Sequence, residues 1–383
     1  MYRTTVRIAF VFIAEAYQVY HAAAIAFALA ERPGVAVDLF HNDPATPHHL
    51  ARIAAAHEFP VPVSQRLAPG LLGSLIQAPR LLGLAKPQVL AHNEALLSNY
   101  DAVISTEGVI GTLFGDRAPG QRPWRILIPH GGGDRLFPAY FSRSRCDFIL
   151  SKGIKDVERE LRTGVAQPGH IAAGGYPKLV TSARLRSTLP ALFPVSRPTV
   201  LYNPHKVPRL GSWHRFIEPL LAAFSDKDVG MNLIVAPHVK MFRRRSPRLR
   251  GKWHARGSAN ILIDTGSDLL LDNSYTEAAD IYLGDVSSQV YEFVARPRPC
   301  VFINTQRVDW REDPHFQFWQ MGEVIEEPAD LIPALRRAPD LHERFRARQI
   351  ELATRALGDT SPHCITRSVD LVIEFIQNGR VAA

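Results

Sequence analysis

The stretch from residue 279 to 303 constrains the fold more than any other part of the sequence. Ala279 to Gly284 is a short apolar segment, followed by a Gly-Asp turn, two serines, a segment with one apolar face, and a second apolar run over Pro299 to Ile303. A strand, a tight turn, a helix and a second strand form the repeating unit of parallel α/β sheets. We expect Ser287 or Ser288 to cap the helix, and the remaining backbone N–H groups and the helix dipole to attract an anion. A capped helix without a ligand explains the same residues equally well.

The same alternation of apolar segments and helices runs through the first half of the chain. Val6 to Ala14 is a continuous apolar run, as expected for a strand buried on both faces of a parallel sheet. An Ala-rich helix is expected over Val19 to Glu31, stopped by Pro33 and Gly34, and a second strand over Val35 to Phe40. Further short strands are expected at residues 100–105, 124–129, 146–150 and 171–173, a short extended piece at 60–63, and a helix at 47–57.

The pattern restarts after a proline-rich segment. Pro190, Pro194 and Pro198 lie close together and indicate a linker at residues 186–198. The sequence therefore predicts an α/β fold of two Rossmann-like, doubly wound domains facing across a cleft, at residues 1–185 and 199–360, with a C-terminal helix at 361–383 that packs back on the first domain. In the second domain we expect strands at 199–202, 232–236 and 260–264 and helices at 213–224 and 339–356, and within the C-terminal segment we expect the helix at 368–378.

Composition narrows the partners and the compartment. The 383 residues include 45 Lys and Arg against 37 Asp and Glu, a net charge of +8 that favours anionic partners. The three cysteines are far apart and form no C-x-x-C pair, so the sequence predicts neither a disulfide framework nor a zinc knuckle and fits a reducing cytoplasm. No apolar run is long enough to cross a bilayer, so we expect a cytoplasmic protein, at most peripheral on the inner face of the cell membrane.

The segment Gly70 to Leu84 stands apart because it is apolar and broken by glycine and proline. Buried irregular packing, a mobile lid and a segment that touches lipid would all have this composition.

Three histidines follow apolar strands through a proline. They are His130 after Leu-Ile-Pro, His205 after Tyr-Asn-Pro and His238 after Val-Ala-Pro. A histidine at the end of a strand can take a proton from a hydroxyl near neutral pH or hydrogen-bond a phosphate, although a single one is more often an ordinary loop residue. The glycines from Gly131 to Gly133 would let the backbone approach a ligand closely and offer it N–H donors.

Several common enzyme classes are disfavoured. No G-x-G-x-x-G follows the first strand, as a nicotinamide or flavin enzyme would require, and the chain has no G-x-S-x-G of an α/β-hydrolase. With no H-E-x-x-H and no pair of aspartates at a strand end, we expect neither a required metal nor another cofactor.

A basic run follows the third of these histidines. This basic run is typical of a solvated loop or of a segment that contacts acidic phospholipid head groups. Nucleic acid is disfavoured, because no aromatic stacking platform or helix-turn-helix pattern accompanies the charges. Its predicted membrane-contacting residues are Arg243, Arg244, Arg245, Arg248 and Arg250.

Residues 124 to 304 resemble the CDP-glycerol glycerophosphotransferases, the teichoic-acid-polymerase-like enzymes with a GT-B fold. Five short motifs occur in the family's order, whereas the first hundred residues match only in the rhythm of strands and helices. The family's His-Gly-Thr-Pro-x-Lys is similar to His130 to Arg135, and its Asp-Tyr-Ser-Ser to Asp285 to Ser288. Its Gly-Tyr-Pro-Arg, Tyr-x-Pro-Thr and Pro-His motifs look like Gly175 to Lys178, Tyr202 to His205, and Pro237-His238.

The resemblance implies a transferase of this GT-B class that moves a glycerol-phosphate or other polyol-phosphate unit from a CDP-activated donor to a hydroxyl of a glycan, polyol-phosphate or lipid-linked acceptor, releasing CMP. The first domain would face the acceptor and the second would hold the nucleotide. His130 would act as general base, and His238, the second catalytic residue, would hold the pyrophosphate. The implied donor-binding residues are Asn203, His205, Lys206, Asp285, Ser287, Ser288 and Gln289, and the implied phosphate or acceptor residues are Gly131, Gly132, Arg135 and Lys178.

Three alternatives stay open from the sequence. A GT-B glycosyltransferase would keep the cleft but use a UDP- or GDP-sugar. A UDP-N-acetylglucosamine 2-epimerase-like isomerase is a second alternative, although such enzymes resemble Asp-Ser-Gly-Gly where this chain has Asp285-Val-Ser-Ser. A module that binds a nucleotide or a lipid without catalysis is the third.

Overall fold

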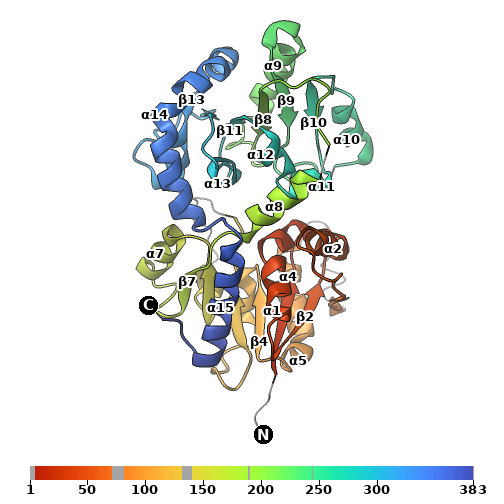
Figure 1. The fold of residues 1–383 in the computed structure, drawn as a ribbon, viewed down its shortest axis with the longest axis vertical. Coiled ribbons are helices and arrows are strands. Elements are labelled where there is room, and N and C mark those ends of the chain that lie inside the picture. The colour runs from red at the N-terminus through yellow and green to blue at the C-terminus, as the bar shows by residue number, and fades with distance from the viewer. Residues whose placement is uncertain (1–4, 71–81, 132–139, 189, 244, 383) are drawn as a thin grey trace. The chain divides into compact units, whose positions relative to one another are not determined.

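A computed structural model describes residues 5–70, 82–131, 140–188, 190–243 and 245–382. Contacts within the chain divide it into two compact units (Figure 1). The first comprises residues 1–130, 137–184 and 355–383, and the second comprises residues 131–136 and 185–354. The chain therefore returns to the first unit at its C-terminal end.

The first unit is built on a parallel sheet in the order β3-β2-β1-β4-β5-β6-β7. The order reverses at β1, whose two neighbours are β2 and β4, and open α/β sheets bind ligands at such a point, beyond the carboxyl ends of the strands. The strands are β1 (Val6–Phe12), β2 (Val35–His41), β3 (Ser64–Arg66), β4 (Ala102–Ser105), β5 (Trp124–Leu127), β6 (Phe148–Ser151) and β7 (Ile171–Ala173).

Helices cover this sheet. α1 and α15 pack against each other, and α15 also contacts β6 (Figure 1). The described helices are η1 (Ala16–His21), α1 (Ala23–Ala30), α2 (Thr46–Ala56), α4 (Leu82–His92), α5 (Glu94–Leu97), η2 (Gly108–Thr112), α6 (Tyr140–Arg143), α7 (Ile154–Arg162), α8 (Pro177–Ser187) and α15 (His363–Asn378).

The second unit repeats the design with a parallel sheet in the order β10-β9-β8-β11-β12-β13. Here the order reverses at β8, which lies between β9 and β11. The strands are β8 (Thr199–Asn203), β9 (Asn232–Val235), β10 (Ile261–Ile263), β11 (Ile281–Gly284), β12 (Cys300–Ile303) and β13 (Glu323–Ile325). The described helices are α9 (Trp213–Ser225), η3 (Lys227–Val229), α10 (Pro247–His254), α11 (Asp268–Leu271), α12 (Ser274–Ala278), α13 (Gln289–Val294), η4 (Pro314–Met321), η5 (Pro328–Asp330) and α14 (Leu331–Leu357).

Burial explains why these segments form strands and helices. Every residue of β8 is buried, as is typical of a strand covered on both faces of a parallel sheet. α9 places Trp213, Phe216, Leu220 and Phe224 on one face at helical spacing, and these side chains belong to the core of the unit. The predicted α/β class with two parallel sheets is confirmed.

Three predicted segments differ from the structure. The helix expected over 19–31 is divided at Ala22 into η1 and α1. The helix expected from Pro339 begins at Leu331 and continues through Pro339, because Ala334 and Leu335 of its first turns pack into the core of the second unit. The basic run contains a helix, α10, whose first turn is capped by Ser246.

The apolar segment at 70–84 lies largely outside the described residues. Within the described ranges, no helix combines the length and the apolar character needed to cross a membrane.

Candidate functional site

His130 lies beyond the carboxyl end of β5 in the first unit, and the contacts of its ring nitrogens are partly buried. Its Nδ1 is 3.1 Å from the carbonyl oxygen of Thr106, which follows β4. A carbonyl oxygen can only accept a hydrogen bond, so Nδ1 carries the proton in this contact. The neutral ring therefore has its lone pair on Nε2, the arrangement that a general base requires.

Gln18 of η1 links this histidine to a carboxylate. The side-chain oxygen of Gln18 accepts a hydrogen bond from Thr106 Oγ1 at 2.8 Å, which fixes the orientation of the amide. The Gln18 amide nitrogen then donates to Glu107 Oε1 at 2.6 Å and lies 3.5 Å from His130 Nε2. Lys86 Nζ is 2.9 Å from the same carboxylate oxygen. We call His130, Gln18, Thr106, Glu107 and Lys86 the His130 cluster.

The surroundings lower the pKa of both His130 and Glu107, so both groups are deprotonated at neutral pH. Desolvation lowers the pKa of His130 from its usual value, although Glu107 and the Thr106 carbonyl act in the opposite direction. Burial by itself would raise the pKa of Glu107, but the charges of His130 and Lys86 and the bond from Gln18 hold it below its usual value. At neutral pH the cluster therefore contains a neutral imidazole next to an ionised carboxylate.

Further basic side chains are buried in the first unit near this histidine. The His21 ring lies 6.1 Å from the His130 ring and 5.6 Å from that of Tyr176. Desolvation and the nearby charge of Lys178 lower the pKa of His21 well below its usual value. Lys152 pairs with Asp156 at 3.0 Å. The phosphate-binding role expected of Lys178, which is buried at the start of α8, stays a prediction.

The Gly-Tyr-Pro segment is positioned by one glycine. Gly175 has a φ of 97°, and a Cβ at this position would lie 2.5 Å from the carbonyl oxygen of Asp359. The next residue, Tyr176, donates its backbone N–H to the same oxygen at 2.7 Å. This contact between the turn and the start of the C-terminal segment therefore has no room for a side chain. Of the glycine-rich segment after His130, only Gly131 is described, with a φ of 72°; Gly132 and Arg135 lie outside the described residues.

The second unit brings His205 and His238 together beyond the ends of β8 and β9. Their rings are 5.6 Å apart. His205 Nδ1 accepts the backbone N–H of Val207 at 3.2 Å, and His238 Nδ1 accepts that of Lys240 at 3.1 Å. Because both Nδ1 atoms accept, each neutral ring carries its proton on Nε2. We call His205 and His238 the paired histidines, and they are donors where His130 is an acceptor.

The environment keeps His238 neutral. Desolvation, together with the charges of His205, Lys206 and Lys240, lowers the pKa of His238 to about 3. The ring therefore offers an N–H donor to an anion over the whole neutral range without needing a positive charge.

Asp285 holds the loop that carries His205. The carboxylate is fully buried and accepts hydrogen bonds from the His205 backbone at 2.8 Å, from the Ser212 backbone at 2.6 Å and from Ser212 Oγ at 2.8 Å. It also accepts from the Val286 backbone at 2.6 Å. Burial raises the pKa of Asp285 to about 6 despite these bonds. Asp285 thus positions the loop that carries His205. The donor-binding role expected of Asp285 stays a prediction, and through these contacts it would act by holding His205 in place.

Two other predicted donor-binding residues also make contacts within the unit. Asn203 is buried, donates to the Ala236 carbonyl at 2.7 Å and accepts from Tyr282. Gln289 donates to Asn273 and Thr276 of the neighbouring segment at 3.2 and 3.0 Å. Both residues tie together the loops beyond the strand ends.

Ser287 and Ser288 were both expected as possible caps of the following helix, and only Ser287 makes a side-chain hydrogen bond to its backbone. Ser287 Oγ accepts the Gln289 backbone N–H at 3.3 Å, while Ser288 is exposed and its hydroxyl makes no capping bond. The helix that follows, α13, has only six residues, so its dipole is smaller than a long helix would supply. Lys206 is exposed beside the paired histidines.

Sequence reasoning found the histidines but missed the groups that orient them. Glu107 and Thr106 follow the apolar strand at Ala102 to Ser105, and the same reading of polar residues at strand ends would have found them. Gln18 could not be found in this way, because it lies inside η1, just before the helix predicted from Val19, and does not directly follow a strand.

Comparison with solved structures places the chain among proteins with two parallel-sheet domains. It is similar to Staphylococcus aureus MnaA in complex with UDP, with a TM-score of 0.65 and 13% identity over 98% of this chain and 97% of that one. It is also similar to UDP-GlcNAc 2-epimerase from Neisseria meningitidis bound to UDP-GlcNAc, with a TM-score of 0.63 and 12% identity over 97% of this chain and 100% of that one.

The wall teichoic acid polymerase TagF is similar to the same degree. A histidine-to-asparagine variant of it matches with a TM-score of 0.64 and 12% identity over 98% of this chain and 89% of that one. No protein-family model matches the chain, and no curated protein matches it. At these identities the comparisons show a GT-B-like fold, which confirms the architecture predicted for the two units.

Proposed function

We propose that the protein is a transferase that moves a polyol-phosphate unit, such as glycerol phosphate, from a CDP-activated donor to an acceptor hydroxyl and releases CMP. The observation that carries this proposal is the opposite tautomers of the histidines in the two units. His130 has an acceptor at Nε2, whereas His205 and His238 have donors there. One group suits a hydroxyl that must lose a proton, and the others suit a phosphate that must be bound.

The proposed step is a displacement at phosphorus. The acceptor oxygen forms a bond to the phosphorus that carries the polyol, and the bond from that phosphorus to the bridging oxygen of CMP breaks. His130 Nε2 takes the proton of the acceptor hydroxyl, and CMP leaves with the electron pair. The paired histidines would neutralise part of the charge on the diphosphate, so the chemistry rests on positioning and electrostatics.

The fold supports a nucleotide-activated donor. Structures with this fold include MnaA in complex with UDP, an epimerase bound to UDP-GlcNAc and a TagF variant soaked with CDPG. The acceptor would be a glycan, a polyol phosphate or a lipid-linked molecule, as the sequence resemblance implies.

A specific observation favours one second candidate, a UDP-GlcNAc 2-epimerase-like reaction. Glu107 and His130 place a carboxylate and an imidazole in one cluster, and removal and return of a proton at carbon uses two such groups. Proteins described as epimerases are also among the similar structures.

Incubation of the purified protein with CDP-glycerol, and separately with UDP-GlcNAc, decides between them. Our proposal expects release of CMP that depends on an added polyol-phosphate acceptor. Formation of a UDP-linked epimer would establish the second candidate instead. The transferase assignment fails if His130→Ala retains near-normal turnover and His238→Ala is also active.

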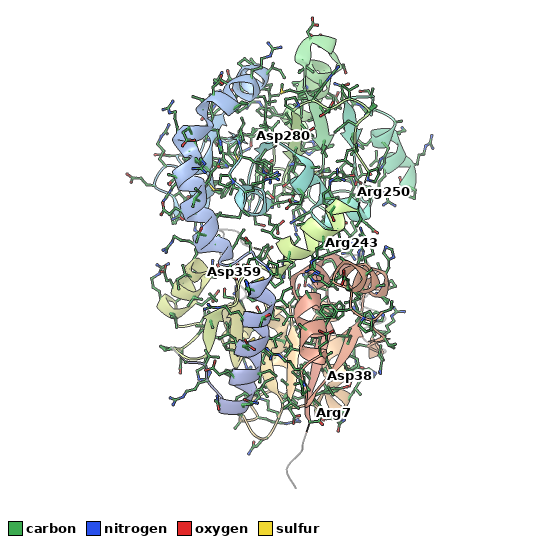
Figure 2. All side chains as sticks on the ribbon, viewed as in Figure 1. Arg7, Asp38, Arg243, Arg250, Asp280 and Asp359 are labelled. Carbon is green, nitrogen blue, oxygen red and sulfur yellow. The ribbon has the colours of Figure 1, made fainter. Side chains whose placement is uncertain are left out.

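We further propose that the basic run of the second unit contacts an anionic membrane surface, which would bring a lipid-linked acceptor close. Arg243, Arg245 and Arg248 are exposed, and Arg250 lies on the arginine-rich helix α10 (Figure 2). Each such charge contributes about 1 kcal/mol near an anionic leaflet. Flotation with phosphatidylglycerol vesicles tests this, and equal flotation with phosphatidylcholine vesicles, or no loss on changing these arginines to glutamine, would refute it.

A further inference from the structure

One cavity in the first unit lies away from all the residues discussed above. It has a volume of about 430 Å³, within the range of small-molecule sites. Its walls come from the loops that lead into β5, β6 and β7, at the amino ends of these strands, whereas His130 lies beyond the carboxyl end of β5. The lining residues that matter are Arg122, Arg125, Arg145, Asp116 and Asp147.

Two arginines in the wall share one carboxylate. Arg122 binds Asp147 through both terminal nitrogens, at 2.6 and 2.8 Å. Asp147 Oδ2 also accepts the backbone N–H of Arg125 at 2.7 Å. The side chains are almost fully buried, 2% exposed for Arg122, 8% for Arg125 and 10% for Asp147. This part of the wall therefore contains two guanidinium charges against one carboxylate.

The second guanidinium is incompletely satisfied. Arg125 Nη1 donates to the carbonyl oxygens of Gly111, Leu113 and Gly115, at 2.9, 3.3 and 3.3 Å. Its Nε is buried, makes no hydrogen bond to any residue that the structure describes, and forms an ion pair with Asp147 Oδ2 at 3.6 Å. Because Asp147 also binds Arg122, this one carboxylate balances two buried guanidinium charges, and the wall keeps an excess of positive charge.

The rim of the cavity adds positive charge that solvent can reach. Arg145 pairs with Asp116, whose side chain is 95% exposed, and Arg117 pairs with Glu94 at 3.1 Å. Exposed pairs of this kind are weak and can exchange partners at little cost. Arginine is also the side chain best suited to bind carboxylate or phosphate through two parallel bonds.

From this geometry we infer that the cavity at the amino ends of β5, β6 and β7 binds a small multivalent anion carrying phosphate or carboxylate groups. The ligand balances the excess positive charge that Arg122 and Arg125 leave beside Asp147, and the rim arginine Arg145 closes on it. The site is separate from the proposed reaction, since none of its lining residues belongs to the His130 cluster or to the paired histidines.

Cys146 gives a local signal for occupancy. It lines the cavity and is partly exposed, whereas Cys300 and Cys364 are buried. Burial raises the pKa of the Cys146 thiol to about 12, so its labelling by a maleimide is slow and is best followed at pH 8.5 by intact mass. A ligand in the cavity slows this labelling, and binding elsewhere leaves it unchanged.

The test measures Cys146 labelling and the thermal midpoint as pyrophosphate or citrate is titrated, with sodium chloride added to matched ionic strength. It uses the His238→Ala background, so that a diphosphate bound at the proposed donor site does not contribute. We expect saturable protection, weakened at least tenfold in Arg145→Gln and in Arg125→Gln. Arg32→Gln, which removes an equally charged exposed arginine that pairs with Asp370, should bind as the parent does.

Two results would overturn the inference. Protection no greater than that given by sodium chloride would show that no anion site exists. Saturable protection unchanged in Arg145→Gln would place the anion elsewhere, and this variant is decisive even if Arg125→Gln fails to fold, because Arg145 is a rim residue. Protection by pyrophosphate alone identifies a phosphate ligand, and protection by citrate alone a carboxylate ligand, each within the proposed class.

Discussion

His130 Nδ1 and the carbonyl oxygen of Thr106 are 3.1 Å apart, and this one contact determines which nitrogen of the ring can accept a proton. Thr106 follows β4 and His130 follows β5, so two neighbouring strands of one sheet set the distance. A residue that replaces His130 would therefore have to place a proton acceptor at the position of Nε2 to keep the function of a base.

The first prediction concerns His130 itself. His130→Ala should lower kcat about a hundred- to ten-thousand-fold, which is the usual contribution of a general base. The dissociation constant of the donor should change little, because the proposed donor contacts come from the other unit. Steady-state kinetics and equilibrium binding measured on one preparation separate the two effects. A parallel loss of donor binding would contradict the assigned role.

The second prediction concerns the pH dependence of the reaction. A base must be unprotonated, so activity should fall at low pH through the pKa of His130, which lies below its usual value. Glu107 raises that pKa and Lys86 lowers it. Glu107→Gln should therefore move the acid limb of kcat/KM to lower pH, and Lys86→Gln should move it to higher pH.

These two variants control for each other. Both remove one charge from the same ion pair, whose atoms are 2.9 Å apart, so a merely structural disturbance would affect them alike. Shifts in the same direction, or no shift in either profile, would show that His130 is not the group that titrates.

The third prediction concerns the paired histidines. Each offers one N–H donor to an anion, and hydrogen bonds to charged groups contribute about 1.5–3 kcal/mol. His238→Ala should weaken donor binding roughly 10- to 150-fold, and this loss should be nearly constant from pH 6 to 8 because the pKa of His238 is about 3. Calorimetric titration at several pH values measures both quantities. A loss that grows towards low pH would mean that the ring binds as a cation.

The sequence predicted the architecture well because its strands are short apolar runs that end at glycine, proline or a polar residue. β8 and β12 follow such runs closely, and every residue of both is buried. β13 was not predicted, because Glu323 to Ile325 is only three residues long and only its last residue is fully buried.

The candidate site was predictable only in part, for a physical reason. A strand end shows where a side chain such as His238 emerges, but not which neighbour satisfies it. Asp285 looked like a ligand-binding residue in the sequence, whereas its bonds to Ser212 and His205 are made with residues more than seventy positions away. Such long-range partners leave no periodic signal along the chain.

The last prediction uses Asp285 to test how the loop with His205 is held. Burial raises the pKa of Asp285 to about 6, above the ordinary value of 3.8. Between these two values the native state holds a proton that the unfolded state has lost, so stability from this group falls as the pH rises from about 4 to about 6. The two-unit shift corresponds to about 3 kcal/mol. The stability advantage of the wild type over Asp285→Asn should therefore shrink across this range in urea unfolding.

Ser212→Ala provides the matched control. Both Ser212 bonds lower the pKa of Asp285, and alanine removes the one from the hydroxyl while keeping the one from the backbone. The pKa of Asp285 should then rise further, and the pH window over which stability falls should extend above 6. The same variant should weaken donor binding, since the loop that carries His205 loses an anchor while both paired histidines remain. An unchanged window would show that Asp285 does not titrate in the native state over this pH range.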